Sequence, residues 1–303
     1  MRVACIGECM VELREEPDGR LARGFGGDTL NTAVYLARLG VAVDYATALG
    51  DDAWSDEMLA AWRREGVGTD LVVRCPGMMP GLYVIQTDPA GERRFLYWRD
   101  SAAARRLFAL PETARIVAAL ATCRLVYYSA ITLSLYGEDG RARLAGALGG
   151  ARAGGATIAF DTNFRPRGWP DRMEAQAAFR RALADADLVF ASVDDLEPLF
   201  GDAWEDELAR ATPDAEVVVK WRDPRCTIRR GAAAPIAVAA GPVAEVVDTT
   251  AAGDSFAAAY IAARLQGLPP DAAATAGHAL AGVVVAHRGA IIPAEAMPPR
   301  AAP

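Results

Sequence analysis

Several features that mark common functional classes are scarce or absent in this sequence. Its 303 residues include five cysteines, an odd number with no Cys-x-x-Cys pair, which favours reduced, buried thiols over disulfides or a metal site. Lys and Arg total 32 against 39 Asp and Glu, a net charge of −7, so no nucleic-acid partner is expected. No signal-peptide pattern opens the sequence and no apolar run is long enough to span a bilayer, so we expect a cytoplasmic protein without a membrane partner.

Two phosphate-binding signatures are also missing. The sequence has no Walker A motif, and its glycine cluster at 24–27 does not fit Gly-x-Gly-x-x-Gly, which disfavours a dinucleotide-binding fold. Gly26 and Gly27 would instead let backbone approach a small ligand at the start of a helical pattern. Asn31 on the first turn of that helix could hydrogen-bond to hydroxyl groups. A plain loop-to-helix junction explains the same residues.

The apolar residues that are present follow a regular pattern. They make up 52% of the sequence, enough for a packed core. Apolar runs typical of strands buried on both faces alternate with alanine-rich helical patterns, which predicts an α/β fold with a mostly parallel sheet between two layers of helices. The predicted strands are 2–7, 43–49, 124–130, 157–161, 187–191 and 216–220, and the predicted helices are 28–39, 53–65, 111–121, 138–153, 172–184 and 203–210.

Two segments break that alternation. Residues 10–25 and 81–99 have the pattern of amphipathic strands, with hairpin turns predicted at 17–19 and 88–91. A small antiparallel sheet inserted into an α/β body would form a lid. The lid would comprise 10–27 and 81–99, and the body 1–9, 28–80 and 100–303. Because the apolar face of such a sheet needs covering, we expect a homodimer that pairs through the lids.

The most informative stretch lies near the C-terminus, at 245–256. A β-branched run ends there in small residues, and Asp254 follows near the N-cap of a helical pattern. Free backbone N–H groups and the positive end of the helix dipole make such a helix start an anion site. A carboxylate beside a bound anion makes sense if a phosphoryl group is transferred and Asp254 takes a proton from the attacking hydroxyl. An ordinary capped helix is the alternative.

A further polar segment, 161–170, follows one of the predicted strands. Open α/β folds bind ligands where their parallel strands end. Arg165 and Arg167 lie in this segment and Arg99 lies at the end of a predicted lid strand. Together the arginines suit a substrate carboxylate or the phosphates of a nucleotide better than a neutral sugar. Taken singly, each arginine fits a solvated surface charge.

These segments, in this order, resemble the ribokinase-like (PfkB) sugar kinases, and within that family the bacterial kinases of the sugar acid 2-keto-3-deoxygluconate. The resemblance covers essentially the whole chain. It is carried by residues 7–10, 26–32, 81–83, 97–99, 161–167, 217–220, 248–255 and 288–293. It implies a three-layer α/β/α body with a small antiparallel β lid, and ATP-dependent phosphorylation of the 6-hydroxyl of 2-keto-3-deoxy-D-gluconate.

The resemblance also implies roles for individual residues. Asp254 would be the base, and the backbone N–H groups of Ala251, Ala252 and Gly253 would form an anion hole. Contacts to the sugar acid would come from Gly27, Asn31, Tyr83, Tyr97, Arg99, Arg165 and Asp254, with the two arginines on its carboxylate. The nucleotide would lie beside Asn163, Ser192, Lys220 and Gly253. Magnesium would be held mainly by ATP oxygens and water, so no dedicated protein site for a metal is expected.

The sequence departs from the family pattern in three places. Ala251 stands where the family usually has glycine, Asp195 is shorter than the glutamate usual near the metal, and the loop 221–226 is bulkier than the usual nucleotide loop. Two other functions stay open. A neutral-sugar kinase, such as a fructokinase or ribokinase, would not need Arg99 and Arg165. A non-catalytic sugar-acid sensor would be expected to lack Asp254.

Overall fold

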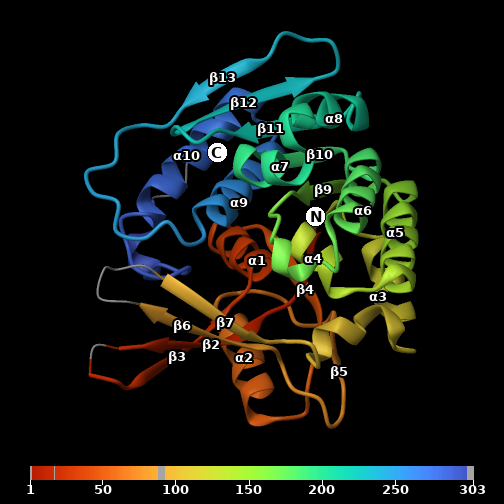
Figure 1. Cartoon of the computed structure of the whole chain (residues 1–303), viewed down its shortest axis with the longest axis vertical. Helices are drawn as coiled ribbons and strands as arrows, with labels where there is room; N and C mark the ends of the chain where they lie inside the picture. Colours follow the sequence, from red (N-terminus) through yellow and green to blue (C-terminus); the bar gives the residue numbers. More distant parts are fainter. Residues whose placement is uncertain (1, 17, 88–92, 299–303) are drawn as a thin grey trace.

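A nine-stranded sheet forms the centre of the larger part of the molecule (Figure 1). The computed structural model describes residues 2–16, 18–87 and 93–298. The strands lie in the order β13-β12-β11-β10-β9-β8-β1-β4-β5, and those from β11 to β5 run parallel. They are β1 (Arg2–Ile6), β4 (Ala42–Leu49), β5 (Val72–Arg74), β8 (Leu125–Ser129), β9 (Thr157–Asp161), β10 (Leu188–Ser192), β11 (Glu216–Lys220), β12 (Arg225–Arg230) and β13 (Ile236–Ala239). The last two extend one edge of the sheet antiparallel.

Helices cover both faces of this sheet, which makes three layers. One face packs against α3 (Thr113–Leu120), α4 (Ala130–Leu135), α5 (Glu138–Ala153), α6 (Arg172–Asp185), α7 (Val193–Phe200) and α8 (Trp204–Ala211). The other packs against α1 (Asp28–Arg38), α2 (Ala53–Arg64), α9 (Ala252–Leu265) and α10 (Pro270–Val284). Among the described residues, no helix combines the length and the apolar character that a bilayer span requires.

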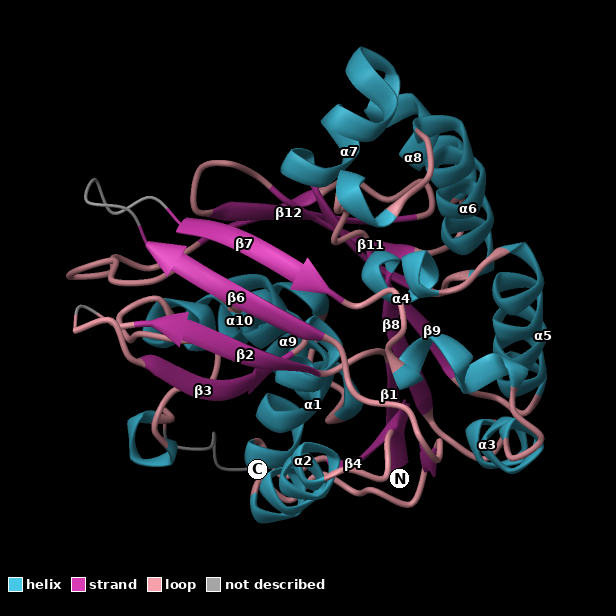
Figure 2. Cartoon of the chain, turned by 60° about the horizontal axis from the view of Figure 1, so that its bottom comes forward, coloured by secondary structure: helices cyan, strands magenta, loops and turns pink. Residues whose placement is uncertain are grey.

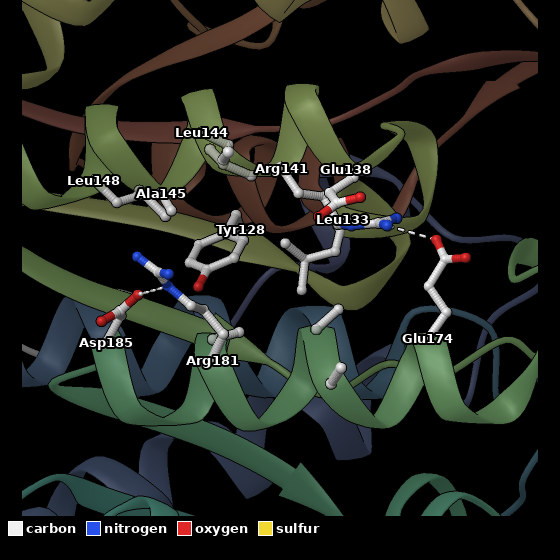
Figure 3. A pocket seen from close by; sticks show the side chains of 14 residues that line it. Tyr128, Leu133, Glu138, Arg141, Leu144, Ala145, Leu148, Glu174, Arg181 and Asp185 are labelled. Atoms are coloured by element: carbon white, nitrogen blue, oxygen red, sulfur yellow. Dashed lines mark hydrogen bonds and ion pairs between the residues drawn. The ribbon is translucent and has the colours of Figure 1, made fainter.

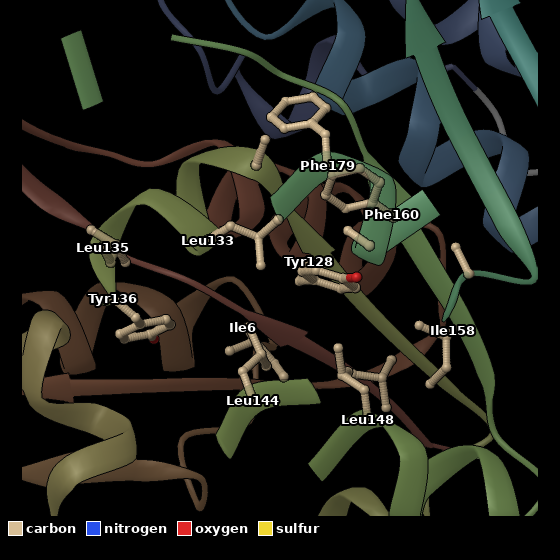
Figure 4. Packing of buried hydrophobic residues seen from close by; sticks show 14 of the residues in the cluster. Ile6, Tyr128, Leu133, Leu135, Tyr136, Leu144, Leu148, Ile158, Phe160 and Phe179 are labelled. Carbon is tan, nitrogen blue, oxygen red and sulfur yellow. The ribbon is translucent and has the colours of Figure 1, made fainter. Parts of the chain in front are cut away.

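Each strand contributes side chains to both cores, because successive residues of a strand point to opposite faces of the sheet. On β8, Tyr127 belongs to the core under α1 and α9, and Tyr128 to the core under α5 and α6. Figure 4 shows this second core, where the ring centroids of Tyr128 and Phe160 lie 5.0 Å apart and those of Phe160 and Phe179 5.8 Å apart. The near-continuous apolar runs of the sequence therefore reflect burial on two sides.

The smaller sheet contains four strands in the order β3-β2-β6-β7 (Figure 2). They are β2 (Met10–Glu15), β3 (Leu21–Gly26), β6 (Leu82–Thr87) and β7 (Arg93–Trp98). The two hairpins, β2–β3 and β6–β7, are antiparallel as expected, but the central pair β2–β6 is parallel. A long excursion of the chain through the body separates β2 from β6, so no tight turn constrains their direction. The turn predicted at 88–91, and Pro17 of the other predicted turn, lie outside the described residues.

All six strands and six helices predicted for the body are present, with ends that differ by at most two residues. The sequence analysis did not identify β5, β12, β13, α4 or α7. Pro198 lies inside α7, where proline normally argues against a helix. Strand β12 has the sequence Arg-Cys-Thr-Ile-Arg-Arg, in which only Cys226 and Ile228 are buried, so its apolar signal is weak. These elements depend on neighbours more than on local pattern.

Candidate active site

The first turn of α1 joins two of the segments that the sequence singles out. Asp28 accepts a hydrogen bond at 2.8 Å from Nδ2 of Asn163, which follows β9. One turn later, Asn31 Nδ2 donates to Asp254 Oδ2 at 2.8 Å. The helix start therefore lies between the polar segment after β9 and the N-terminus of α9. Asn31, predicted to contact the sugar, also holds the predicted base.

Helix α9 begins with an unusual backbone conformation. Its N-cap residue, Ala251, has φ 61° and ψ 14°, and no other non-glycine residue in the described part of the chain has a positive φ. A left-handed conformation costs a non-glycine residue roughly 1–2 kcal/mol. The helix starts at Ala252, so Asp254 lies within its first turn, three residues after the N-cap. Asp254 therefore belongs to the turn that carries the unpaired N–H groups and the positive end of the helix dipole.

These N–H groups are partly free. Those of Ala251 and Gly253 donate to no described residue, whereas the N–H of Ala252 donates to the carbonyl oxygen of Thr249 at 3.2 Å. The first N–H groups of a helix have no partner within the helix and lie at the positive end of its dipole. The start of α9 can thus receive an anion through at least two backbone donors.

A single lysine lies against this helix start. Lys220, the last residue of β11, is the only lysine in a sequence that otherwise uses arginine for every permanent positive side chain. Its Nζ donates to Asp161 Oδ2 at 3.2 Å. A Cβ added at Gly253 would lie 3.3 Å from the same nitrogen. The ammonium group and the helix dipole therefore attract an anion to the same place.

The charges around the start of α9 shift the pKa values of Asp254 and Lys220. Burial and the nearby carboxylate of Asp28 raise the pKa of Asp254, against the opposing effects of the Asn31 hydrogen bond and Lys220. Burial tends to lower the pKa of Lys220, but Asp161 and the other nearby carboxylates outweigh it, so the pKa is raised. A carboxyl group with a raised pKa beside a fixed ammonium group is typical of a proton acceptor in catalysis.

The predicted nucleotide contacts gather at the carboxyl ends of neighbouring strands. Ser192 ends β10 and is the register partner of Lys220 on β11. Its Oγ accepts a hydrogen bond from the N–H of Asp194 at 3.2 Å and so caps α7. Asn163 lies two residues after β9, and its own N–H donates to Asp161 Oδ1 at 3.1 Å. Parallel strands thus bring Asn163, Ser192 and Lys220 to one edge of the sheet, where α/β folds bind ligands.

Two predicted sugar ligands at the smaller sheet are each held by an acid. Arg99, directly after β7, forms an ion pair with Glu8, whose side chain is 1% exposed. The hydroxyl of Tyr83 on β6 donates to Glu12, and burial together with Glu12 raises the pKa of Tyr83. The ring of Tyr97, whose centroid is 5.9 Å from that of Tyr83, is exposed.

The second predicted carboxylate ligand, Arg165, is more exposed, and its Nη1 donates to the carbonyl oxygen of Phe164 at 2.8 Å. The side chain of Arg165 is 58% exposed, and its Nη1 lies 3.4 Å from Oδ1 of Asp195. Asp195 is buried and also accepts hydrogen bonds from Thr162 Oγ1 at 2.8 Å and from the N–H of Phe164 at 3.0 Å. Both carboxylate oxygens of Asp195 are therefore engaged in shaping the segment that carries Arg165.

Comparison with known proteins identifies the family. The sequence matches the pfkB family of carbohydrate kinases over residues 1–297. This chain belongs to that family. A 2-dehydro-3-deoxygluconokinase from Dickeya dadantii is 45% identical over 98% of both chains, and one from Escherichia coli K12 is 42% identical over 98% of this chain and 99% of its own. A fructokinase from Xylella fastidiosa with bound ATP superposes with a TM-score of 0.85 at 24% identity, over 98% of this chain and 95% of its own. The predicted family and the ribokinase-like fold are confirmed.

The kinase also contains a cavity of about 600 Å³ away from these residues, between α5 and α6 (Figure 3). Leucine and alanine side chains line it together with Tyr128. Ion pairs between Arg141 and Glu174 and between Arg181 and Asp185 lie at its two ends. None of the predicted site residues lines this cavity, so it belongs to the packing between the two helices rather than to the site.

Three acids of the site received no role in the sequence analysis: Glu8, Asp28 and Asp161. A signal existed for two of them, because Asp161 ends a predicted strand and Glu8 directly follows one, and polar residues at the carboxyl ends of parallel strands mark ligand sites. The sequence contains one lysine among 32 lysines and arginines, which favours a role for Lys220 that an ammonium group performs and a guanidinium group does not. Asp28 had no local signal beyond its place at a helix start.

Proposed function

We propose that the kinase transfers the γ-phosphoryl group of ATP to the 6-hydroxyl of 2-keto-3-deoxy-D-gluconate, the sugar acid also called 2-dehydro-3-deoxygluconate. The observation that carries the proposal is the placement of Asp254, a carboxylate with a raised pKa held by Asn31 at the N-terminus of α9. Relatives named 2-dehydro-3-deoxygluconokinases at 42% and 45% identity support this substrate over a neutral sugar.

In the proposed reaction, Asp254 accepts the proton of the 6-hydroxyl as the hydroxyl oxygen attacks the γ-phosphorus. The bond from that phosphorus to the bridging β–γ oxygen breaks, and ADP leaves. Free N–H groups of Ala251 and Gly253, and the ammonium group of Lys220, stabilise the negative charge on the transferred group. The N–H of Ala252 completes the anion hole when a phosphoryl oxygen replaces its hydrogen bond to the Thr249 carbonyl.

The remaining residues would hold the two substrates. Arg99 and Arg165 would bind the carboxylate of the sugar acid, since guanidinium groups donate strong, charge-assisted hydrogen bonds to carboxylates. Backbone at Gly27 and the side chains of Tyr83 and Tyr97 would line the sugar. Asn163 and Ser192 would approach the phosphates of ATP from the strand ends.

Magnesium, when bound with ATP, would neutralise part of the phosphate charge. The nearest acids fit a metal that arrives on the nucleotide, because Asp161 pairs with Lys220 and both oxygens of Asp195 are engaged by protein groups.

A cytoplasmic location stays a prediction. We also propose a homodimer through the lids, because Leu21 and Trp98 of the smaller sheet are exposed; a monomer by sedimentation at micromolar concentration would contradict it.

A coupled assay of ADP release tests the function. Wild type, with ATP and magnesium, should turn over 2-keto-3-deoxygluconate and not fructose or ribose. Asp254→Asn should lower kcat by about 10²–10⁴-fold, the usual cost of removing a general base. Asp44→Asn, which changes a buried acid near the amino end of β4, serves as the matched control and should retain activity. Preference for a neutral sugar would overturn the substrate, and full activity of Asp254→Asn would overturn the mechanism.

A further inference from the structure

We infer that Glu8 is a positioning residue that orients the guanidinium group of Arg99 toward the carboxylate of the sugar acid. The inference rests on the proposed function, in which Arg99 binds that carboxylate. Glu8 lies two residues after β1 of the larger sheet, and Arg99 directly follows β7 of the smaller one. Their ion pair therefore ties the predicted ligand on the lid to the body of the kinase.

Burial distinguishes this pair from a second ion pair seen among the described residues, which links helix α2 to the smaller sheet. The side chains of Glu8 and Arg99 are 1% and 18% exposed, whereas those of Glu57 on α2 and Arg23 on β3 are 47% and 41% exposed. Exposed ion pairs contribute little to stability, because water screens the two charges and both side chains lose conformational freedom. A buried pair restricts its members to one geometry, and removing one member leaves the other charge without compensation.

Glycine lets the backbone close around the pair. A Cβ added at Gly81, just before β6, would lie 2.8 Å from Glu8 Oε1 and 3.1 Å from Cβ of Arg99. A Cβ at Gly27, just before α1, would lie 2.2 Å from the carbonyl oxygen of Glu8. The chain just before β6 and the start of α1 thus enclose Glu8, so its carboxylate has little room to move.

The three nitrogens of the Arg99 guanidinium group have different surroundings as a result. Nη2 of Arg99 donates to Glu8 Oε2, and Nε is buried without a partner among the described residues. Nη1 also donates to no described residue but is not buried. Glu8 therefore fixes the group in an orientation that leaves one nitrogen accessible to a ligand. A carboxylate has the charge and the acceptor oxygens that this nitrogen requires.

A double-mutant cycle with Glu8→Gln, Arg99→Met and the double variant tests the inference, with KM and kcat measured for 2-keto-3-deoxygluconate. Glu8→Gln should raise KM about tenfold and change kcat less than about threefold, because a neutral amide holds the guanidinium group more weakly. Glu8→Asp, which keeps the charge, should recover part of the loss. In the Arg99→Met background, Glu8→Gln should have almost no further effect. Glu57→Gln, which breaks the exposed pair between α2 and β3, is the matched control and should leave KM unchanged.

Three results would overturn the inference: an unchanged KM for Glu8→Gln, a lower KM, which would show that Glu8 competes with the substrate, or an effect of Glu8→Gln that persists without Arg99. The double variant removes both charges, so it avoids an unpaired buried ion if a single variant folds poorly. Wild type that does not turn over the sugar acid contradicts the proposed function itself. Normal wild-type turnover with any of the three results contradicts the role of Glu8 alone.

Discussion

The two ends of the proposed site treat charge in opposite ways. At the transfer end, Asp28, Asp161 and Asp254 lie near a single cation, Lys220, so negative charge is in excess. Repulsion from Asp28 adds to burial and raises the pKa of Asp254, which gives this carboxylate a greater affinity for a proton. The excess of negative charge around Asp254 therefore favours its role as the proton acceptor.

At the recognition end, each arginine is matched with one acid. Arg99 pairs with the buried Glu8, and Arg165 pairs with Asp195 through an exposed guanidinium group at 3.4 Å. In each pair the arginine offsets part of the effect by which burial raises the pKa of its acid, and the acid in turn restricts the orientation of the guanidinium group. In the proposed site, uncompensated negative charge therefore accompanies the base, and charge paired with an acid accompanies the arginines that would bind the substrate.

After Asp254→Asn, the largest effect is expected at Lys220, which can be replaced by another cation without changing the net charge of the transfer end. Lys220→Arg should lower kcat by about 10²-fold, similar to the loss of one transition-state donor. The reason is that a planar guanidinium group does not fit the point next to Gly253 that a compact ammonium group occupies. Steady-state kinetics measure the loss. Arg38→Lys, the reverse exchange at the C-terminal end of α1, is the control and should leave kcat unchanged. A fully active Lys220→Arg would show that the positive charge alone suffices.

A smaller effect is expected at Arg165, which separates its contribution from that of Arg99. Arg165→Met should raise KM for the sugar acid less than tenfold, and less than Arg99→Met does, because an exposed cation is already screened by water. The contribution of Arg165 should also shrink as salt is added. KM measured at low and high ionic strength checks both points. Arg167→Met, an exposed arginine of the same segment, should have no effect; equal losses at Arg99 and Arg165 would remove the distinction.

The smallest effect concerns pH and tests the excess of negative charge. Asp28 raises the pKa of Asp254, so Asp28→Asn should lower it and let Asp254 ionise at a lower pH. The acid limb of the profile of kcat/KM against pH should then move to lower pH by roughly one unit or less. Asp44→Asn, a change of a distant buried acid, should leave the limb in place. A shift to higher pH would contradict the repulsion between the two carboxylates.

The sequence predicted more of the body than of the lid or the site geometry. Strands such as 157–161 were identifiable because burial on both faces leaves a continuous apolar run. Asp254 was identifiable because a small-residue turn followed by a helical pattern marks an anion site locally. The parallel pairing of β2 with β6 had no such local signature, because it depends on where the chain returns after the body segment between them.

The α/β class and the family could be predicted from the sequence, and the residues of the proposed chemistry could be named from it, since these depend on residue type and on spacing along short segments. Which of these residues touch depends on the tertiary structure. Asn31 and Asp254 are 223 positions apart, and Glu8 and Arg99 are 91 apart. No periodicity reports such contacts, because they arise where strand ends and helix starts from distant segments meet at one edge of a sheet. Which carboxylate becomes a base and which becomes a partner for arginine follows from that packing, through burial and the distance to neighbouring charges.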